Sequence, residues 1–173
     1  LFQPIIKKIV REIEGQRPFE KRSLSPLFYA IADHIRAVVF SIYDGIIPSN
    51  EGRGYVVRKI IRKSILHLRA LGISKPFLNK LTFVVAEVMR KPYPDLKERQ
   101  EAIALMVLNE ERNFINTLNS TAALFKEKFS GIGSKADRVK AGRIAFELYD
   151  TYGIPLDLTR EWLSSERIDF SEE

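Results

Sequence analysis

The sequence predicts an all-α protein, and three observations support this fold class. Apolar residues recur every three or four positions along most of the chain, which is the spacing of one buried helix face. No stretch alternates apolar and polar residues over several positions, so we expect no substantial sheet. Residues 95–130 contain no proline or glycine and are rich in helix formers. We therefore expect two packed helical subdomains linked by one long helix.

Four helices are predicted in the first half of the chain, over residues 1–14, 27–43, 55–71 and 77–89. Gly45 is expected to end the second helix in a left-handed conformation. Pro48 prevents a continuous helix through the following turn, while Gly52 and Gly54 allow another backbone to approach closely. Prolines at 92 and 94 interrupt the chain after the fourth helix. We place domain divisions accordingly, giving residues 1–25, 26–92 and 93–173.

The second half is predicted to contain the long helix over residues 95–130 and two shorter helices over 136–152 and 156–167. The long helix has a narrow apolar stripe, which suits pairing with one neighbouring helix. Asp150 falls in the last turn of the 136–152 helix, where a carboxylate opposes the helix dipole. Such an unfavourable placement indicates a functional role for Asp150.

Composition restricts the possible functions. The 173 residues are 45% hydrophobic and 29% charged, as in ordinary folded domains. The absence of cysteine excludes disulfides, thiol catalysis and zinc knuckles, and we expect His34 and His67 in packing or on the surface. No apolar run approaches the ~20 residues of a membrane span, so no membrane partner is expected. The chain opens with helix-like sequence, so we expect no signal peptide and interpret it as part of a longer protein.

The helix expected over residues 55–71 is the most informative one, because its two faces differ sharply. Val56, Val57, Ile60 and Ile61 begin an apolar face, whereas the opposite face is cationic, with no carboxylate between residues 53 and 71. A solvated helix usually mixes charge signs, although a plain solvated face stays an alternative. With a net charge of +6, the row favours a polyanion such as RNA. The candidate phosphate-binding residues are Arg53, Arg58, Lys59, Arg62, Lys63 and Arg69.

Two polar residues are candidates for reading a base. Asn50 is either the N-cap of the following helix or an amide that reads a base edge. Asp150 is either an unpaired surface carboxylate or an acceptor for a base amino group. The tyrosines at 43, 55, 149 and 152 are interpreted as core-edge aromatics, with stacking on a nucleotide as the alternative. No hydrolase triad, phosphate loop or metalloprotease motif is present, so we predict no catalytic residue and no metal site.

Three long motifs resemble the alanyl-tRNA synthetase family. They are Ile31-Ala-Asp-His-Ile-Arg-Ala, then Asp44-Gly-Ile-Ile-Pro-Ser-Asn-Glu-Gly-Arg-Gly-Tyr with the basic helix after it, and Leu148-Tyr-Asp-Thr-Tyr-Gly. The resemblance covers nearly the whole chain. It implies that residues 1–14 end an aminoacylation domain and that the remainder is a helical tRNA-recognition domain.

The resemblance also implies a function and a partner. In that family the matching asparagine and aspartate, here Asn50 and Asp150, read a guanine–uracil wobble pair in the acceptor stem of alanine tRNA. The basic row matches the family's arginine-rich helix. The family's cytoplasmic class II enzymes attach alanine to tRNA using ATP with Mg. Their ATP- and alanine-binding motifs, zinc-dependent editing domain and dimerisation region have no counterpart here, so no cofactor and no isolated activity is expected, and those missing domains are expected partners.

Two other functions stay open from the residues alone. A helical protein-interaction module would use the basic face to meet an acidic protein. A DNA-binding helix-turn-helix protein needs a short turn before its recognition helix, and the turn over residues 46–54 is long for that.

Overall fold

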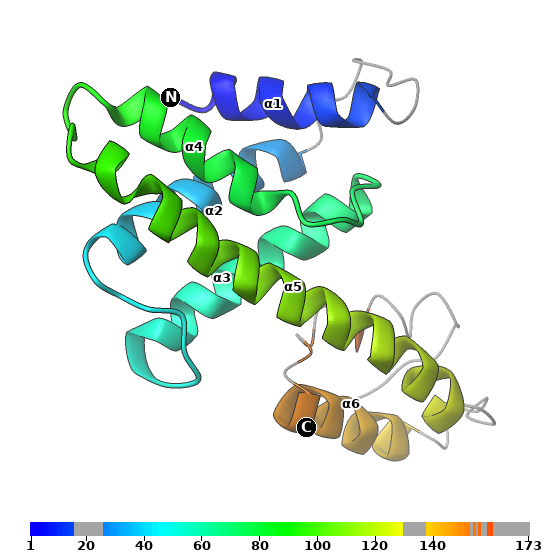
Figure 1. Ribbon diagram of the computed structural model, residues 1–173. Coiled ribbons are helices and arrows are strands. Elements are labelled where there is room, and N and C mark those ends of the chain that lie inside the picture. Colours follow the sequence, from blue (N-terminus) through cyan, green and yellow to red (C-terminus); the bar gives the residue numbers. More distant parts are fainter. Residues whose placement is uncertain (16–25, 130–137, 153, 155, 157–158, 161–173) are drawn as a thin grey trace. The chain divides into compact units, whose positions relative to one another are not determined.

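The computed structural model describes residues 1–15, 26–129, 138–152, 154, 156, 159 and 160, and these residues contain helices without any strand (Figure 1). The all-α prediction is confirmed. Most of the helix predicted over residues 156–167 lies outside the described residues. The helices are α1 (Gln3–Glu14), α2 (Pro26–Tyr43), α3 (Gly52–Ala70), α4 (Leu78–Met89), α5 (Leu96–Phe129) and α6 (Arg138–Tyr152).

The chain forms two compact units, Leu1–Ile115 and Asn116–Glu173. Their division falls within α5, the long helix that the absence of proline and glycine predicted. The division into functional domains after residues 25 and 92 stays a prediction.

In the first unit, α2 is the central helix, because it contacts α1, α3 and α4 (Figure 1). Its apolar residues recur with helical spacing, so one side of every turn enters the core. Phe28 is fully buried, whereas Leu27, the first residue of the helix predicted over residues 27–43, is only partly covered. The buried side of α2 therefore begins at Phe28.

Two histidines contribute to the packing of α2 against α3. His34 Nδ1 lies 3.2 Å from Ser64 Oγ, and that hydroxyl donates to the backbone oxygen of Ile60 at 2.9 Å. Because the hydroxyl proton is used there, Ser64 Oγ accepts from His34. The rings of His34 and His67 stack with centroids 5.7 Å apart. The expectation that both histidines serve in packing or on the surface is confirmed.

The start of α4 is capped by a carboxylate from α5. Glu111 accepts backbone N–H bonds from Phe77 at 2.7 Å, Leu78 at 2.8 Å and Asn79 at 3.3 Å. These N–H groups belong to the first turn of a helix, where no intrahelical partner exists. The side chain of the N-cap residue Phe77 makes no capping bond, so Glu111 takes that role across the core. This contact ties α5 to α4.

Burial raises the pKa of Glu111 above its ordinary value of 4.5, although the three N–H bonds and Lys80 act in the opposite direction. A raised pKa in the folded state means that the folded chain binds this proton more tightly than the unfolded chain. The stabilisation linked to this proton is therefore complete below pH 4.5 and is lost as pH rises through the raised pKa.

We predict that the free energy of unfolding of the wild-type chain falls with rising pH above 4.5 more steeply than that of the Glu111→Gln variant, whose residue 111 cannot titrate. Urea unfolding followed by circular dichroism across this pH range measures both. Glu101→Gln, which removes an exposed carboxylate of the same helix, is expected to keep the wild-type slope. Equal slopes for Glu111→Gln and wild type would contradict the prediction.

Candidate nucleic-acid interface

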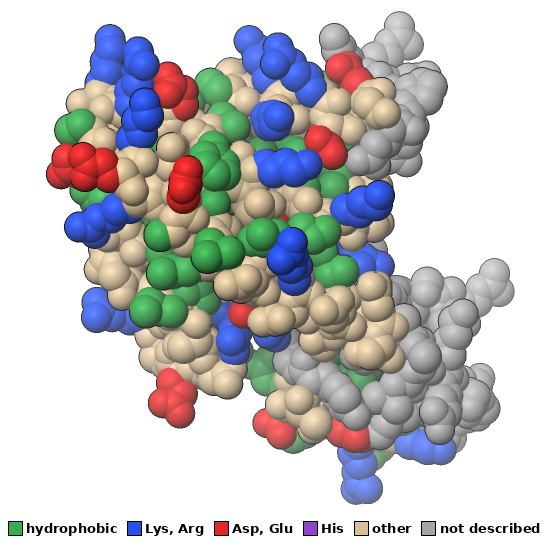
Figure 2. Space-filling view, viewed as in Figure 1, with side chains coloured by type: hydrophobic (Ala, Val, Ile, Leu, Met, Phe, Trp, Pro, Cys, Tyr) green, Lys and Arg blue, Asp and Glu red, His purple; other side chains and the backbone are tan. Residues whose placement is uncertain are grey.

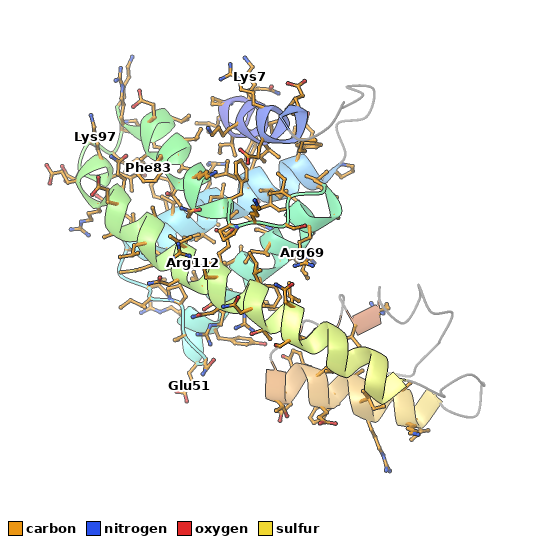
Figure 3. All side chains as sticks on the ribbon, turned by 45° about the vertical axis from the view of Figure 1, so that its right-hand side comes forward. Lys7, Glu51, Arg69, Phe83, Lys97 and Arg112 are labelled. Carbon is orange, nitrogen blue, oxygen red and sulfur yellow. The ribbon has the colours of Figure 1, made fainter. Side chains whose placement is uncertain are left out.

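The turn between α2 and α3 is fixed at both ends. Gly45 has φ 88°, which confirms its predicted left-handed conformation. At the other end α3 begins with Gly52, and its N-cap residue is Glu51 rather than Asn50. The side chain of Glu51 makes no capping bond and points away from the helices at the tip of the turn (Figure 3). The interpretation of Asn50 as the helix cap is therefore wrong.

Gly54 lets this turn lie directly on the first turn of α3. A Cβ atom at residue 54 would be 2.3 Å from the backbone oxygen of Ile47 and 2.2 Å from Ser49 Oγ. Real Cβ atoms do not approach oxygen this closely, so the close approach predicted for Gly54 is confirmed. Gly52 differs from this prediction: its Cβ would meet nothing within 4 Å, and glycine is favoured there by a φ of 53°.

Asn50 is exposed, and its amide oxygen Oδ1 accepts a hydrogen bond from Arg58 Nη1. Arg58 lies two turns along α3, so this bond joins the turn to the helix it precedes. It also assigns the orientation of the amide, because only the oxygen can accept from a guanidinium.

Two arginines of α3 have a carboxylate partner that the local sequence does not show. Arg58 Nε donates to Glu110 Oε2 at 3.1 Å, and Arg62 Nε donates to Glu110 Oε1 at 2.9 Å. Glu110 lies on α5, and its side chain is only 6% exposed, compared with 23% for Arg58 and 17% for Arg62. The Arg62 guanidinium also lies over the ring of Phe114, 5.0 Å from its centroid. We call Glu110, Arg58 and Arg62 the arginine clamp.

Sequence reasoning missed Glu110 because it lies 52 residues from Arg58 and 48 from Arg62. One signal was available. The buried stripe of α5, which includes Ile103, Val107 and Phe114, passes through positions 110 and 111. Carboxylates at positions that fall within an apolar stripe require partners, because a buried charge is costly when unpaired.

The predicted phosphate-binding row therefore has two kinds of member. Arg53, Lys59 and Lys63 are exposed, whereas Arg58 and Arg62 belong to the arginine clamp, and Arg69 is partly covered near the end of α3 (Figure 3). Arg58 and Arg62 would have to leave a buried carboxylate in order to bind another anion.

Apolar side chains lie beside these cations at the start of α3. Val56, which we had placed on the buried face, is 54% exposed, and Ile47 in the turn is 63% exposed. Val57 and Ile61, which were predicted on the same face, are buried, with exposures of 3% and 0%. The buried face of α3 is thus narrower than predicted, and the exposed surface at the start of α3 is both apolar and cationic.

Positive charge is not confined to α3. Figure 2 shows lysine and arginine side chains on several parts of the visible face, and Figure 3 labels Lys7 on α1 together with Lys97 and Arg112 on α5. The net charge of +6 is consequently a weak argument by itself. The local arrangement of the turn and α3 is what indicates an interface.

Asp150 lies in the second unit, where it is exposed near the end of α6, as the sequence predicted. Ala141, Ala145 and Leu148 form the buried side of this helix, whereas Val139 is 68% exposed. The convergence of Asn50 and Asp150 on one base pair stays a prediction.

The described residues include no group of three or more histidine, aspartate or glutamate side chains arranged to hold a metal ion. None of their helices combines the length and apolarity needed to cross a bilayer.

The whole chain, residues 1–173, matches the family model described as tRNA synthetases class II (A). A protein named alanine–tRNA ligase from Bacillus pumilus is 40% identical to the chain over all 173 residues. The chain belongs to the alanyl-tRNA synthetase family. The resemblance drawn from the three motifs is thereby confirmed.

Other members of the alanyl-tRNA synthetase family give the same result. The alanine–tRNA ligase of Ligilactobacillus salivarius is 41% identical over 173 residues, and that of Geobacillus kaustophilus is 43% identical over 162 residues, or 94% of this chain. The chain spans 20% of the Bacillus pumilus and Ligilactobacillus salivarius proteins and 18% of the Geobacillus kaustophilus protein.

We predict that Gly54→Ala lowers the free energy of unfolding by about 1–3 kcal/mol, because the new methyl group overpacks the contact between α3 and the turn. Gly15→Ala is the matched control. Its Cβ would lie 3.5 Å from the backbone oxygen of Arg11, an ordinary contact, and should change stability by less than about 0.5 kcal/mol. Urea unfolding compares the two, and equal effects would contradict the close approach.

Proposed function

We propose that this chain is the tRNA-recognition region of an alanine–tRNA ligase and that it binds the acceptor stem of alanine tRNA. Membership of the family supports the general assignment. The assignment to the acceptor stem is supported by the position of Asn50. This residue is exposed on a turn that packs against α3, next to that helix's cations.

Phosphate binding is assigned to the cationic row. Arg53, Lys59 and Lys63 are exposed and contact the RNA backbone, with Arg69 further along α3. Arg58 and Arg62 add to the local positive potential while they stay bound to Glu110. Each phosphate neutralised by a lysine or arginine releases counterions, so the binding weakens with salt.

Base reading is assigned to Asn50 and Asp150. In a guanine–uracil wobble pair the guanine 2-amino group takes no part in base pairing, whereas in a guanine–cytosine pair it is bonded to cytosine. The amide of Asn50 can accept from this group on the second lone pair of Oδ1. Asp150, which is exposed, is the proposed second reader of the pair, on the other groove.

The catalytic steps belong to other parts of the enzyme in this proposal. The relatives are named alanine–tRNA ligase, and we propose the same overall reaction, attachment of alanine to tRNA, for the protein that contains this chain. ATP with Mg and the zinc of the editing domain would bind outside these residues. These cofactors and a cytoplasmic location stay predictions.

A protein-interaction module is the second candidate function. The exposed apolar side chains of Ile47 and Val56 favour it, because apolar contacts contribute more to protein interfaces than to RNA backbone binding. Its partner would be an acidic protein that covers the start of α3.

We predict that Asn50→Ala reduces discrimination between acceptor minihelices with a guanine–uracil pair and with a guanine–cytosine pair by about 1–3 kcal/mol, because one reading amide is lost. Gel-shift titration of both minihelices measures this difference. Asn109→Ala removes an exposed asparagine of α5 and should leave it unchanged. Unchanged discrimination in Asn50→Ala would refute the assignment of Asn50.

We predict that Lys59→Ala weakens binding of both minihelices equally and reduces the slope of log affinity against log salt by about 1. The reason is that this exposed lysine contacts a phosphate and no base. Lys97→Ala, on α5, removes the same charge and should leave the slope unchanged. Equal effects of the two variants would favour the second candidate function. So would a chain that binds an acidic protein tightly but has no affinity for RNA.

A further inference from the structure

We propose that Glu110 is a positioning residue for base-pair reading: it fixes Arg58, and Arg58 in turn fixes the amide of Asn50. This inference rests on the proposed reading role of Asn50. It begins with the carboxylate, whose two oxygens each accept from a different arginine of α3. Because both oxygens are occupied and the side chain is 6% exposed, Glu110 has one orientation relative to α3.

Arg58 connects Glu110 to Asn50. Its Nε is bound to Glu110 Oε2, and its Nη1 donates to Asn50 Oδ1. A guanidinium is planar and rigid, so fixing Nε also fixes the direction in which Nη1 points. A lysine at this position would keep the charge but would have no second, fixed donor.

Asn50 is the last member of this chain of contacts. Because its oxygen is bound to Arg58, the Asn50 amide resists flipping over. The flipped amide would place its N–H groups against the N–H groups of the guanidinium. An amide free to rotate would offer a donor or an acceptor to the same base atom with similar ease. A held amide offers only the acceptor Oδ1 at that place. A fixed acceptor distinguishes a guanine amino group that is free to donate from one that is bonded to cytosine.

Stability alone does not explain the arginine clamp. Burying the carboxylate and partly covering two guanidinium groups removes part of their hydration, and buried ion pairs are often no more stabilising than apolar residues of the same volume. The clamp also joins two cations to one carboxylate, so it retains excess positive charge. An arrangement that fixes direction while keeping a cationic surface suits the placement of a reading group beside RNA.

The test measures the ratio of affinities for the guanine–uracil and guanine–cytosine minihelices in four variants of the chain. Glu110→Gln and Arg58→Lys are each expected to lower this ratio about tenfold, a loss within the range of directly coupled residues. Glu101→Gln changes the net charge as Glu110→Gln does, but on an exposed side of α5, and should keep the wild-type ratio. Asn50→Ala gives the affinity ratio expected when the reading amide is absent.

A double variant distinguishes a positioning role of Glu110 from a general contribution to the stability of the fold. If Glu110 acts through Asn50, the double variant Glu110→Gln with Asn50→Ala has the same ratio as Asn50→Ala alone. A further loss in the double variant would overturn the inference. Thermal unfolding checks each variant, and Arg58→Lys, which leaves Arg62 on Glu110, carries the test if Glu110→Gln does not fold.

The remaining outcomes separate this inference from the proposed function. A wild-type ratio in both Glu110→Gln and Arg58→Lys, together with a lowered ratio in Asn50→Ala, would overturn the positioning role and leave the reading role intact. A wild-type ratio in Asn50→Ala would overturn both.

Discussion

A buried carboxylate that needs partners is the constraint on which the first unit depends. Glu110 enters the protein interior from α5 and is accompanied there by two guanidinium groups of α3. Its neighbour Glu111 is equally buried and accepts the N–H groups at the start of α4. Adjacent residues of a helix point about 100° apart. One pair of glutamates therefore connects α5 to two different helices.

These contacts determine where the candidate site lies. The clamp fixes the first half of α3 relative to α5, and Gly54 allows the preceding turn to pack on that same part of α3. Asn50 is consequently attached to the helical scaffold twice, through the backbone of the turn and through Arg58. The exposed side chains at the start of α3, which include Lys59 and Val56, are both cationic and apolar. A polar group held in this way by a rigid support is suited to reading a base.

The local features of the fold followed from the sequence, because they depend on neighbouring residues. Helical periodicity and the positions of glycine and proline predicted the helices, the left-handed Gly45 and the close approach at Gly54. The three motifs led to the correct family. Contacts between distant residues were not predictable in this way. Glu110 and Glu111 satisfy groups 32 to 52 residues away, and no local pattern marks them as partners.

The same limit explains the errors at the site. Of the two alternatives for Asn50, the helix cap is wrong, because the N-cap is Glu51, one residue later, and Asn50 Oδ1 accepts from Arg58. The basic row was treated as uniform, because the helical wheel ignores what packs against it. For the same reason the wheel predicts a buried Val56, which is 54% exposed.

The arginine clamp can be observed directly through the guanidinium protons of a ¹⁵N-labelled chain. The structure predicts that the Nε–H protons of Arg58 and Arg62 exchange with water more slowly than that of the exposed Arg53. It further predicts that Glu110→Gln accelerates exchange at both arginines. Exchange at Arg58 and Arg62 as fast as at Arg53 in the wild-type chain would contradict the clamp.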